Sequence, residues 1–286
     1  MWALCTGQKI FGFFEKLWIT RFLYWPDGGK VAAMSTNGRL VAVIGSRGGA
    51  GASCLAASIA QAFQRQTQNC VLVDLCDIGA GIEVLLGIEG EPGARWPEME
   101  AARGEVDGSE LVLALPQWQG VPVLSVSRHQ QTPVPEEVVL DVCAGLIRNG
   151  AIVVVDIPAP ASWNPAIRAL LADADQVMIA TPDSTVGLAG AVAVALALDG
   201  IGDALGGSTT RRRRAAQPDQ AVALRTRSGS RVGETDVAKL VGRPVMVRFR
   251  EDRNLATAIE LGAGPSVKSA KRLAKAGQAI ANEVIG

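Results

Sequence analysis

The sequence predicts an α/β fold in which a three-layer, doubly wound and mostly parallel sheet spans residues 38–286. Two observations predict it. Short apolar runs rich in β-branched residues recur along the chain, and helix-like stretches separate most of them. The runs are continuous rather than alternating, which is typical of strands that helices bury on both faces. Right-handed crossovers then place helices on both sides of the sheet.

The elements follow one another in a regular order. The expected strands are the apolar runs at 40–44, 70–74, 121–126, 151–155, 176–180, 221–225 and 244–248. The expected helices are the stretches at 52–66, 135–148, 163–172, 184–199, 234–241, 253–261 and 266–284. Together these elements predict one domain from residue 38 to the end of the chain.

Two segments break the alternation. Residues 88–110 are rich in Gly, Glu and Pro, and we expect them to form an acidic surface excursion. Residues 200–220 form a polar insertion that carries Arg211 to Arg214. These arginines could contact anionic lipid or nucleic acid, and a solvated loop is the alternative.

Charge and cysteine content exclude several classes of protein. Lys+Arg and Asp+Glu each number 28, so net charge favours neither a nucleic-acid partner nor a membrane surface. The five cysteines show no CxxC pair and no zinc spacing, which predicts reduced thiols in a cytoplasmic protein. The single histidine, His129, lies in a polar loop and disfavours histidine-based triads and metal sites. No run of 18 apolar residues is present, so no transmembrane helix is expected.

Residues 1–37 form an aromatic-rich N-terminal extension. Eight of the thirteen aromatic residues of the chain lie within residues 1–25, at helical spacing and mixed with basic residues. Three interpretations remain open: an interfacial amphipathic helix, a helix packed on the domain, or a non-native start upstream of Met34. A signal peptide is disfavoured, because Glu15, Lys16 and Arg21 interrupt the apolar core.

A glycine-rich turn, "GSRGGAGAS", joins the first strand to the first helix. Such a turn exposes backbone N–H groups that hold phosphate at the positive end of the helix dipole. The glycines do not fit GxGxxG, so a dinucleotide-binding enzyme is only an alternative. The deviant phosphate loop KGGxGK[ST] fits better, although both lysines are replaced. The predicted nucleotide-binding residues are Arg47, Gly48, Gly49, Ala50, Gly51, Ala52, Ser53 and Cys54.

Two strand ends carry carboxylates. The run "AIVVVDIPAP" ends in Asp156, and the strand at 70–74 ends in Asp74. A carboxylate at the end of a buried strand beside a phosphate loop is what Mg²⁺ binding requires. Asp156 is therefore a predicted Mg²⁺ ligand, and this strand end together with the glycine loop makes the predicted fold P-loop NTPase-like.

These motifs resemble the MinD/ParA superfamily of deviant-Walker ATPases, and within it the CpaE-like branch, which includes actinobacterial septum site-determining proteins. The resemblance rests on "SRGGAGAS", "VLVDLCDIGAGIEVLLGIEGEPGARW", "VVVDIP", "ADQVMIATPDS" and "RLAKAGQAI" and covers residues 38–286. Members of this branch often carry a receiver-like N-terminal domain. Residues 1–37 could be what is left of one.

The resemblance implies a role for single residues. Ser53 matches the Mg²⁺-binding hydroxyl, and Asp74 matches the aspartate that positions the attacking water. Cys76 stands in the slot of the second aspartate of this motif, with Asp77 one residue later. Arg47 replaces the signature lysine that reaches across an ATP-bound dimer, and Ala52 replaces the loop lysine. The family's adenine-reading asparagine is not evident in "ALRTRSG".

The resemblance also implies a function. We expect a spatial regulator of septum placement, or of secretion or pilus machinery, that binds ATP and Mg²⁺ weakly and is deficient in hydrolysis. A nucleotide-dependent homodimer and protein partners from those machineries are expected, and nucleic acid is not. The expected location is the cytoplasm, with peripheral contact at the inner face of the cell membrane as an option. An active ATPase in which Arg47 replaces the lysines is the alternative.

Overall fold

The computed structural model describes residues 38–76, 79, 81–99, 102, 104–127, 134–204 and 218–286. The N-terminal extension at 1–37, Asp77, His129 and the run Arg211 to Arg214 lie outside the described residues.

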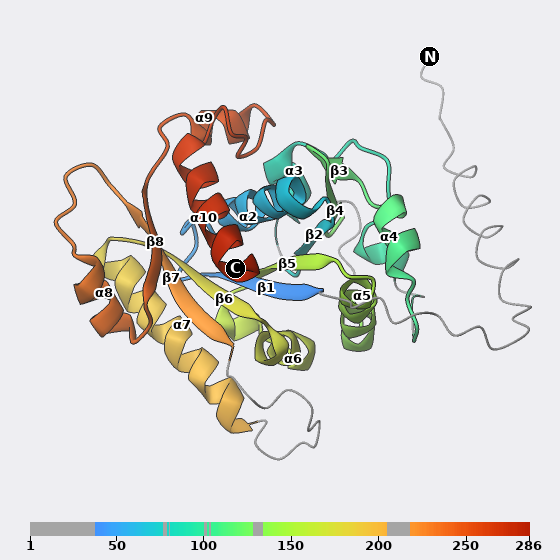
Figure 1. Cartoon of the computed structure of the whole chain (residues 1–286), viewed down its shortest axis with the longest axis horizontal. Helices are drawn as coiled ribbons and strands as arrows, with labels where there is room; N and C mark the ends of the chain where they lie inside the picture. The colour runs from blue at the N-terminus through green and yellow to red at the C-terminus, as the bar shows by residue number, and fades with distance from the viewer. Residues whose placement is uncertain are drawn as a thin grey trace, which may run out of the picture. The chain divides into compact units, whose positions relative to one another are not determined.

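One eight-stranded sheet forms the centre of the domain, in the order β3-β4-β2-β5-β1-β6-β7-β8 (Figure 1). Its strands are β1 (Arg39–Gly45), β2 (Cys70–Asp74), β3 (Gln117–Trp118), β4 (Val121–Leu124), β5 (Ile152–Ile157), β6 (Gln176–Pro182), β7 (Asp219–Thr226) and β8 (Val245–Arg250). All pairs are parallel except β3 with β4 at one edge. The predicted mostly parallel sheet is therefore confirmed, and β3 is a short strand that the sequence did not predict.

Helices cover both faces of the sheet, which confirms the three-layer arrangement. The helices are α2 (Ala52–Thr67), α3 (Gly81–Leu86), α4 (Gly108–Ala114), α5 (Glu136–Arg148), α6 (Pro165–Asp173), α7 (Thr185–Ala204), α8 (Glu234–Val241), α9 (Leu255–Glu260) and α10 (Lys271–Ile285). Two short 3₁₀ helices, η1 (Trp96–Met99) and η2 (Pro160–Ser162), complete the elements. Buried residues of α4 to α8 pack on one face, and those of α2, α3 and α10 pack on the other.

The central strands owe their burial to this double cover. All six residues of β5 are buried, and successive side chains point to opposite faces. Val153 and Val155 join the core under α5 and α6, whereas Val154 joins the core under α2 and α10. This placement explains why the strand is apolar at every position, up to the aspartate near its end.

The segment 88–110 is not the surface excursion that its composition suggested. Trp96 is 1% exposed, and Ala94 and Met99 are also buried in the core. Arg95 forms a partly buried ion pair with Glu83 at 2.6 Å and donates to the carbonyls of Ile88, Glu91 and Gly93. Gly, Glu and Pro made the segment look solvated, but a few apolar anchors and one arginine hold it against the sheet.

Helices α2 and α10 lie in close contact, as Figure 1 shows above the sheet. The Ser58 hydroxyl of α2 donates to the carbonyl of Leu273 at 3.0 Å. A Cβ added at Gly277 would lie 2.5 Å from the Ser58 hydroxyl oxygen and 2.7 Å from its carbonyl oxygen. The glycine therefore permits the close approach of the two helices.

Among the described residues, no helix has both the length and the apolar character needed to cross a bilayer.

Candidate functional site

The candidate site lies at the carboxyl ends of β1, β5 and β2, which are neighbours in that order. The loop 45–52 leaves β1, Asp156 lies near the end of β5, and Asp74 ends β2. In open α/β sheets, ligands bind in the crevice outside the carboxyl ends of the strands. The topology therefore brings the predicted loop and both predicted carboxylates to one crevice.

The glycine loop ends at the first turn of α2. Gly49 has φ 71° and Gly51 has φ 94°, left-handed conformations that favour glycine. Gly51 is the N-cap of α2 and supplies no side-chain cap, and the first turn contains no acidic residue. The first intrahelical bond runs from the Leu55 N–H to the Gly51 carbonyl at 2.9 Å. The earlier N–H groups of α2 therefore have no acceptor within the helix and suit an anion.

Asp156 and Asp74 lie directly opposite each other on the paired strands β5 and β2. Their exposed fractions are 2% and 1%. Burial and, to a lesser extent, the charge of Asp74 together raise the pKa of Asp156 to about 8, although a hydrogen bond with Ser53 opposes the shift. Ser53 and Asp156, the two predicted Mg²⁺ ligands, are thus in direct contact.

Asp74 accepts hydrogen bonds from the segment that follows β2. Its carboxylate accepts the N–H groups of Cys76 at 2.9 Å and Ile82 at 2.8 Å, and the Ser125 hydroxyl at 3.3 Å. Burial raises its pKa, and hydrogen bonds from Cys76, Ile82 and Ser125 oppose the rise. The Asp74 carboxylate therefore orders the backbone beside the crevice.

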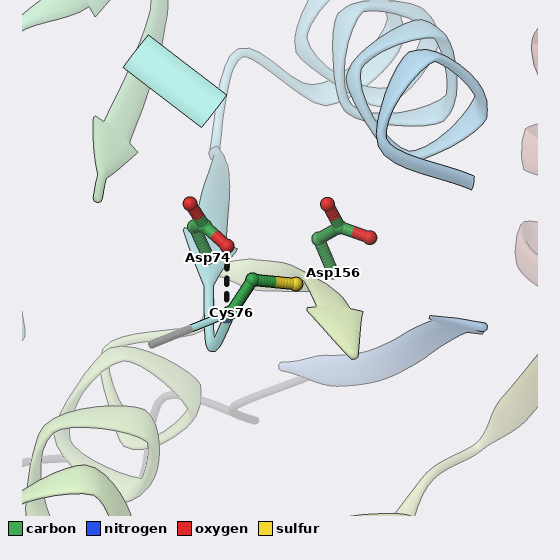
Figure 2. Close-up of side chains that lie close together, drawn as sticks. All are labelled: Asp74, Cys76 and Asp156. Atoms are coloured by element: carbon green, nitrogen blue, oxygen red, sulfur yellow. Dashed lines mark hydrogen bonds between the residues drawn. The ribbon is translucent and has the colours of Figure 1, made fainter. Parts of the chain in front are cut away.

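Cys76 completes a cluster with the two carboxylates (Figure 2). One ligand atom from each of Asp74, Cys76 and Asp156 lies within 4.8 Å of the others. Carboxylate and hydroxyl oxygens are the ligands that Mg²⁺ prefers, whereas thiolates suit softer metals. Asp156 and Ser53 therefore fit a magnesium ion, and Cys76 is a poor ligand for it.

A cleft of about 810 Å³ opens over the loop. All eight predicted loop residues line it, together with Asp156 and Cys76. Its opposite wall comes from the ends of β7 and β8, from α9 and from the start of α10. Asp74 is not among the lining residues. The Arg47 side chain is exposed and donates to the carbonyl of Gly48 at 2.9 Å.

Two tryptophans donate hydrogen bonds to backbone carbonyls at or just beyond the ends of β2 and β5. Neither of them was assigned a role from the sequence. The indole N–H of Trp96 donates to the carbonyl of Asp74 at 2.7 Å. That of Trp163 donates to the carbonyl of Pro158 at 2.9 Å, two residues beyond Asp156. Both indoles are buried. The Trp96 bond joins residues 22 positions apart, which no local motif marks, whereas the Trp163 bond spans only 5 positions after β5.

Arg225, on β7, is the other residue that sequence reasoning missed. Its guanidinium Nη2 donates to the carbonyl of Gly49 in the loop at 3.0 Å. It also acts on the Cys54 thiol, whose pKa is raised to about 11 by burial and by Asp156 while Arg225 lowers it. Its position in the sequence could have indicated this role, because Arg225 lies near the carboxyl end of an apolar strand. In a parallel sheet, that end lies at the same edge as the glycine loop.

A model of the family described as cellulose biosynthesis protein BcsQ matches residues 39–189, just over half of the chain. The chain belongs to this family, within the MinD/ParA superfamily. The match covers the glycine loop, both carboxylates and the strands that carry them.

This MinD/ParA-family chain is similar in sequence to two other proteins and in fold to several solved structures. Uncharacterized proteins from two strains of Mycobacterium tuberculosis are 34% identical over 227 residues, covering 79% of the chain. The chain spans 58% of the length of these relatives. A ParA family ATPase from Chlorobium tepidum shares the fold with a TM-score of 0.66 and 19% identity, over 88% of this chain and 99% of that one. The septum site-determining protein MinD from Pyrococcus horikoshii, complexed with Mg-ADP, gives 0.63 and 16%, over 86% and 95%.

Proposed function

We propose that this chain is a MinD/ParA-like spatial regulator that binds ATP with Mg²⁺ weakly and hydrolyses it at a rate near background. The observation that carries the proposal is the open glycine loop at the N-terminus of α2, which forms the floor of a cleft of about 810 Å³. Clefts of roughly 300–1,000 Å³ are typical of small-molecule and cofactor sites. The solved relative with Mg-ADP supports the choice of nucleotide class.

The cleft offers different chemistry along its length. Backbone N–H groups and Ser53 lie at the loop end, where phosphates would be held by Gly48, Gly49 and Gly51. Apolar side chains line the wall formed by β8 and α9, among them Phe249, Leu255 and Ile259. A flat aromatic base requires such an apolar surface, so the two ends suit the two parts of a nucleotide.

Ser53 and Asp156 would hold the magnesium ion, which would neutralise phosphate charge when bound. Hydrolysis of ATP requires further cations besides the magnesium ion. Cations must stabilise the charge that develops on the transferred phosphoryl group, and the loop lysine that supplies one is replaced by Ala52. Asp74, proposed as the residue that orients water, already accepts two backbone N–H groups. These features support binding with slow hydrolysis.

Two alternatives differ in what they require. An active ATPase would need Arg47 to act as the loop cation, yet its side chain is exposed and turned to the carbonyl of Gly48. A dinucleotide-binding enzyme would place the second strand beside the first, in the order 3-2-1-4-5-6. Here β5 separates β1 from β2, which argues against that alternative.

We place the chain in the CpaE-like branch and propose septum, secretion or pilus machinery as its cargo. The family description names cellulose biosynthesis, so an envelope polysaccharide machinery is the competing cargo. Nucleotide-controlled homodimerisation and peripheral contact with the inner face of the cell membrane would couple the site to that cargo. Imaging a fluorescent fusion would separate a division-site pattern from a polar or secretion-site pattern.

Calorimetric titration of the full chain with ATP and ADP, with and without Mg²⁺, tests the biochemical proposal. We expect micromolar to millimolar affinity, since a lost hydrogen bond to a charged group costs about 1.5–3 kcal/mol. Steady-state phosphate release should stay near background. Robust Mg²⁺-dependent hydrolysis that Asp74→Ala abolishes would restore the active enzyme. Thermal protection by NAD(H) and not by ATP would support the dinucleotide alternative.

A further inference from the structure

Arg225 reaches the glycine loop from a strand on the other side of the crevice. Its Nη2 atom donates to the carbonyl of Gly49 at 3.0 Å. Its Nη1 atom lies 3.4 Å from the position that a Cβ on Gly51 would take. The two guanidinium nitrogens thus lie near the two left-handed glycines of the loop, of which Gly51 directly precedes Ala52.

Among the described residues, no strong ion pair explains this placement. Arg225 pairs with Glu251, whose carboxylate oxygen lies 3.8 Å from Nη1. The Glu251 side chain is 55% exposed, while that of Arg225 is 21% exposed. An ion pair of this length with an exposed partner contributes little. The guanidinium therefore retains most of its capacity to bind an anion in the cleft that it lines.

Among the other arginines that line the cleft, Arg47 and Arg272 have different hydrogen-bond partners. Arg47 is exposed and donates to its own neighbour, Gly48. Arg272 donates to the carbonyl of Glu251 and lies at the start of α10. Within the part of the chain that the structure describes, Arg225 is the arginine from outside the loop that hydrogen-bonds to it.

We propose that Arg225 supplies, from β7, the phosphate-binding cation that Ala52 cannot supply from the loop. This inference rests on the proposed nucleotide binding and names the residue that makes it possible. A planar guanidinium presents several N–H donors and can bind phosphate oxygens in a bidentate manner. On binding, one of its donors would pass from the Gly49 carbonyl to the phosphate, and the charge would stay beside the loop.

The test compares binding of ATP, ADP and inorganic tripolyphosphate to the full chain and its variants. Tripolyphosphate reports on the phosphate end alone. Arg225→Ala should weaken binding of all three probes by about ten- to a hundredfold. Arg225→Gln, which removes the charge but keeps a polar amide, should lose about as much, and Arg225→Lys should lose less. Arg248→Ala is the matched control, because Arg248 lies on the neighbouring strand, pairs with Glu234 and does not line the cleft.

A second variant separates charge from structure. Adding Ala52→Lys to Arg225→Ala should return most of the lost affinity, because the lysine restores a cation at the loop. A purely structural arginine would not be replaced in this way. Thermal melting of each variant shows whether it folds, and Arg225→Gln keeps the test valid if Arg225→Ala is unstable.

The outcomes separate this inference from the proposed function. Nucleotide binding that is unchanged or tightened in Arg225→Ala and Arg225→Gln overturns the inference and leaves the function standing. Tripolyphosphate binding that needs Arg225, with no preference for nucleotides, supports the inference and overturns the function. A wild-type chain that binds none of the three probes overturns both.

Discussion

Asp74 and Asp156 lie opposite each other on paired strands, and both are withdrawn from water. Two like charges at such a place oppose ionisation of the pair, as does burial itself. The folded protein therefore holds a proton here at pH values where an exposed aspartate has lost it. Protonation of the pair links stability to pH through this difference.

The first prediction follows from the pKa of Asp156, which is raised from its ordinary value of 3.8 to about 8. Between these values the folded state binds more protons than the unfolded chain, so stability should fall as pH rises from 4 to 8. Asp156→Asn should flatten this decline and melt higher than wild type at pH 8. Melting curves across the range provide the measurement.

Asp173→Asn serves as the control for this prediction, because Asp173 is an exposed carboxylate at the end of α6. It should leave the decline as it is in wild type. An Asp156→Asn variant whose melting temperature follows the wild-type slope would contradict the assignment.

The second prediction concerns Trp96, whose indole N–H satisfies the carbonyl of Asp74 at 2.7 Å. Trp96→Phe leaves a buried carbonyl without this donor and removes part of a packed ring, so it should cost about 1–3 kcal/mol. Urea unfolding measures the loss.

Trp118→Phe is a suitable comparison, because Trp118 is also buried and its indole nitrogen has no acceptor among the described residues. Its loss should be smaller than that of Trp96→Phe. Equal losses in the two variants would mean that the bond to Asp74 contributes nothing beyond packing.

Residues within the loop could be predicted from the sequence, because their function depends on spacing along the chain. Ser53 and Asp156 were paired by motif, and the structure places them in contact. Arg225 and Trp96 could not be assigned, because their hydrogen-bond partners lie far along the sequence. Gly49 and Arg225, for example, are 176 positions apart.

At the scale of elements, the contact between α2 and α10 gives the third prediction. Gly277→Ala would place a Cβ 2.7 Å from the carbonyl oxygen of Ser58, so the helices must separate. Overpacking of this kind costs about 1–3 kcal/mol. Chemical unfolding of the variant measures it.

Gly200→Ala is the matched control, since Gly200 is an exposed residue of α7 with nothing within 4 Å of an added Cβ. It should be neutral or stabilising by up to about 1 kcal/mol, because alanine favours helix. If Gly277→Ala proves as stable as Gly200→Ala, α10 does not pack on α2 as described.

The long elements were predictable, whereas several of the short ones were not. Continuous apolar runs marked β1, β5 and β6 within one or two residues, because burial on both faces leaves a clear pattern. The helices α3 and α4 and the strand β3 are short, and tertiary contacts rather than periodicity define them. The prediction of a surface excursion at 88–110 was wrong for the same reason, because tertiary contacts of Trp96 and Arg95 bury part of this segment.

At the scale of the whole molecule, the fourth prediction concerns assembly. Arg47 is exposed at the mouth of the cleft, where it can reach a phosphate or a second copy of the chain. If ATP induces a dimer, Arg47→Ala should abolish it while the monomer stays folded. Size-exclusion chromatography with light scattering, with and without Mg·ATP, provides the measurement. Profiles identical to wild type would exclude a role for Arg47 in assembly.

The strand order also dictates when the domain can form during synthesis. β1 carries the glycine loop, but its two neighbours, β5 and β6, begin only at Ile152 and Gln176. Until the ribosome has released residue 157, both edges of β1 are unpaired, and the edge that pairs with β6 stays unpaired until residue 182 is released. Unpaired edges invite association with other chains. Parallel pairings over such sequence distances also form slowly. A nascent chain that stops before β6 therefore exposes one edge of the apolar strand β1, and this stage of biogenesis is where we expect the protein to depend most on chaperones.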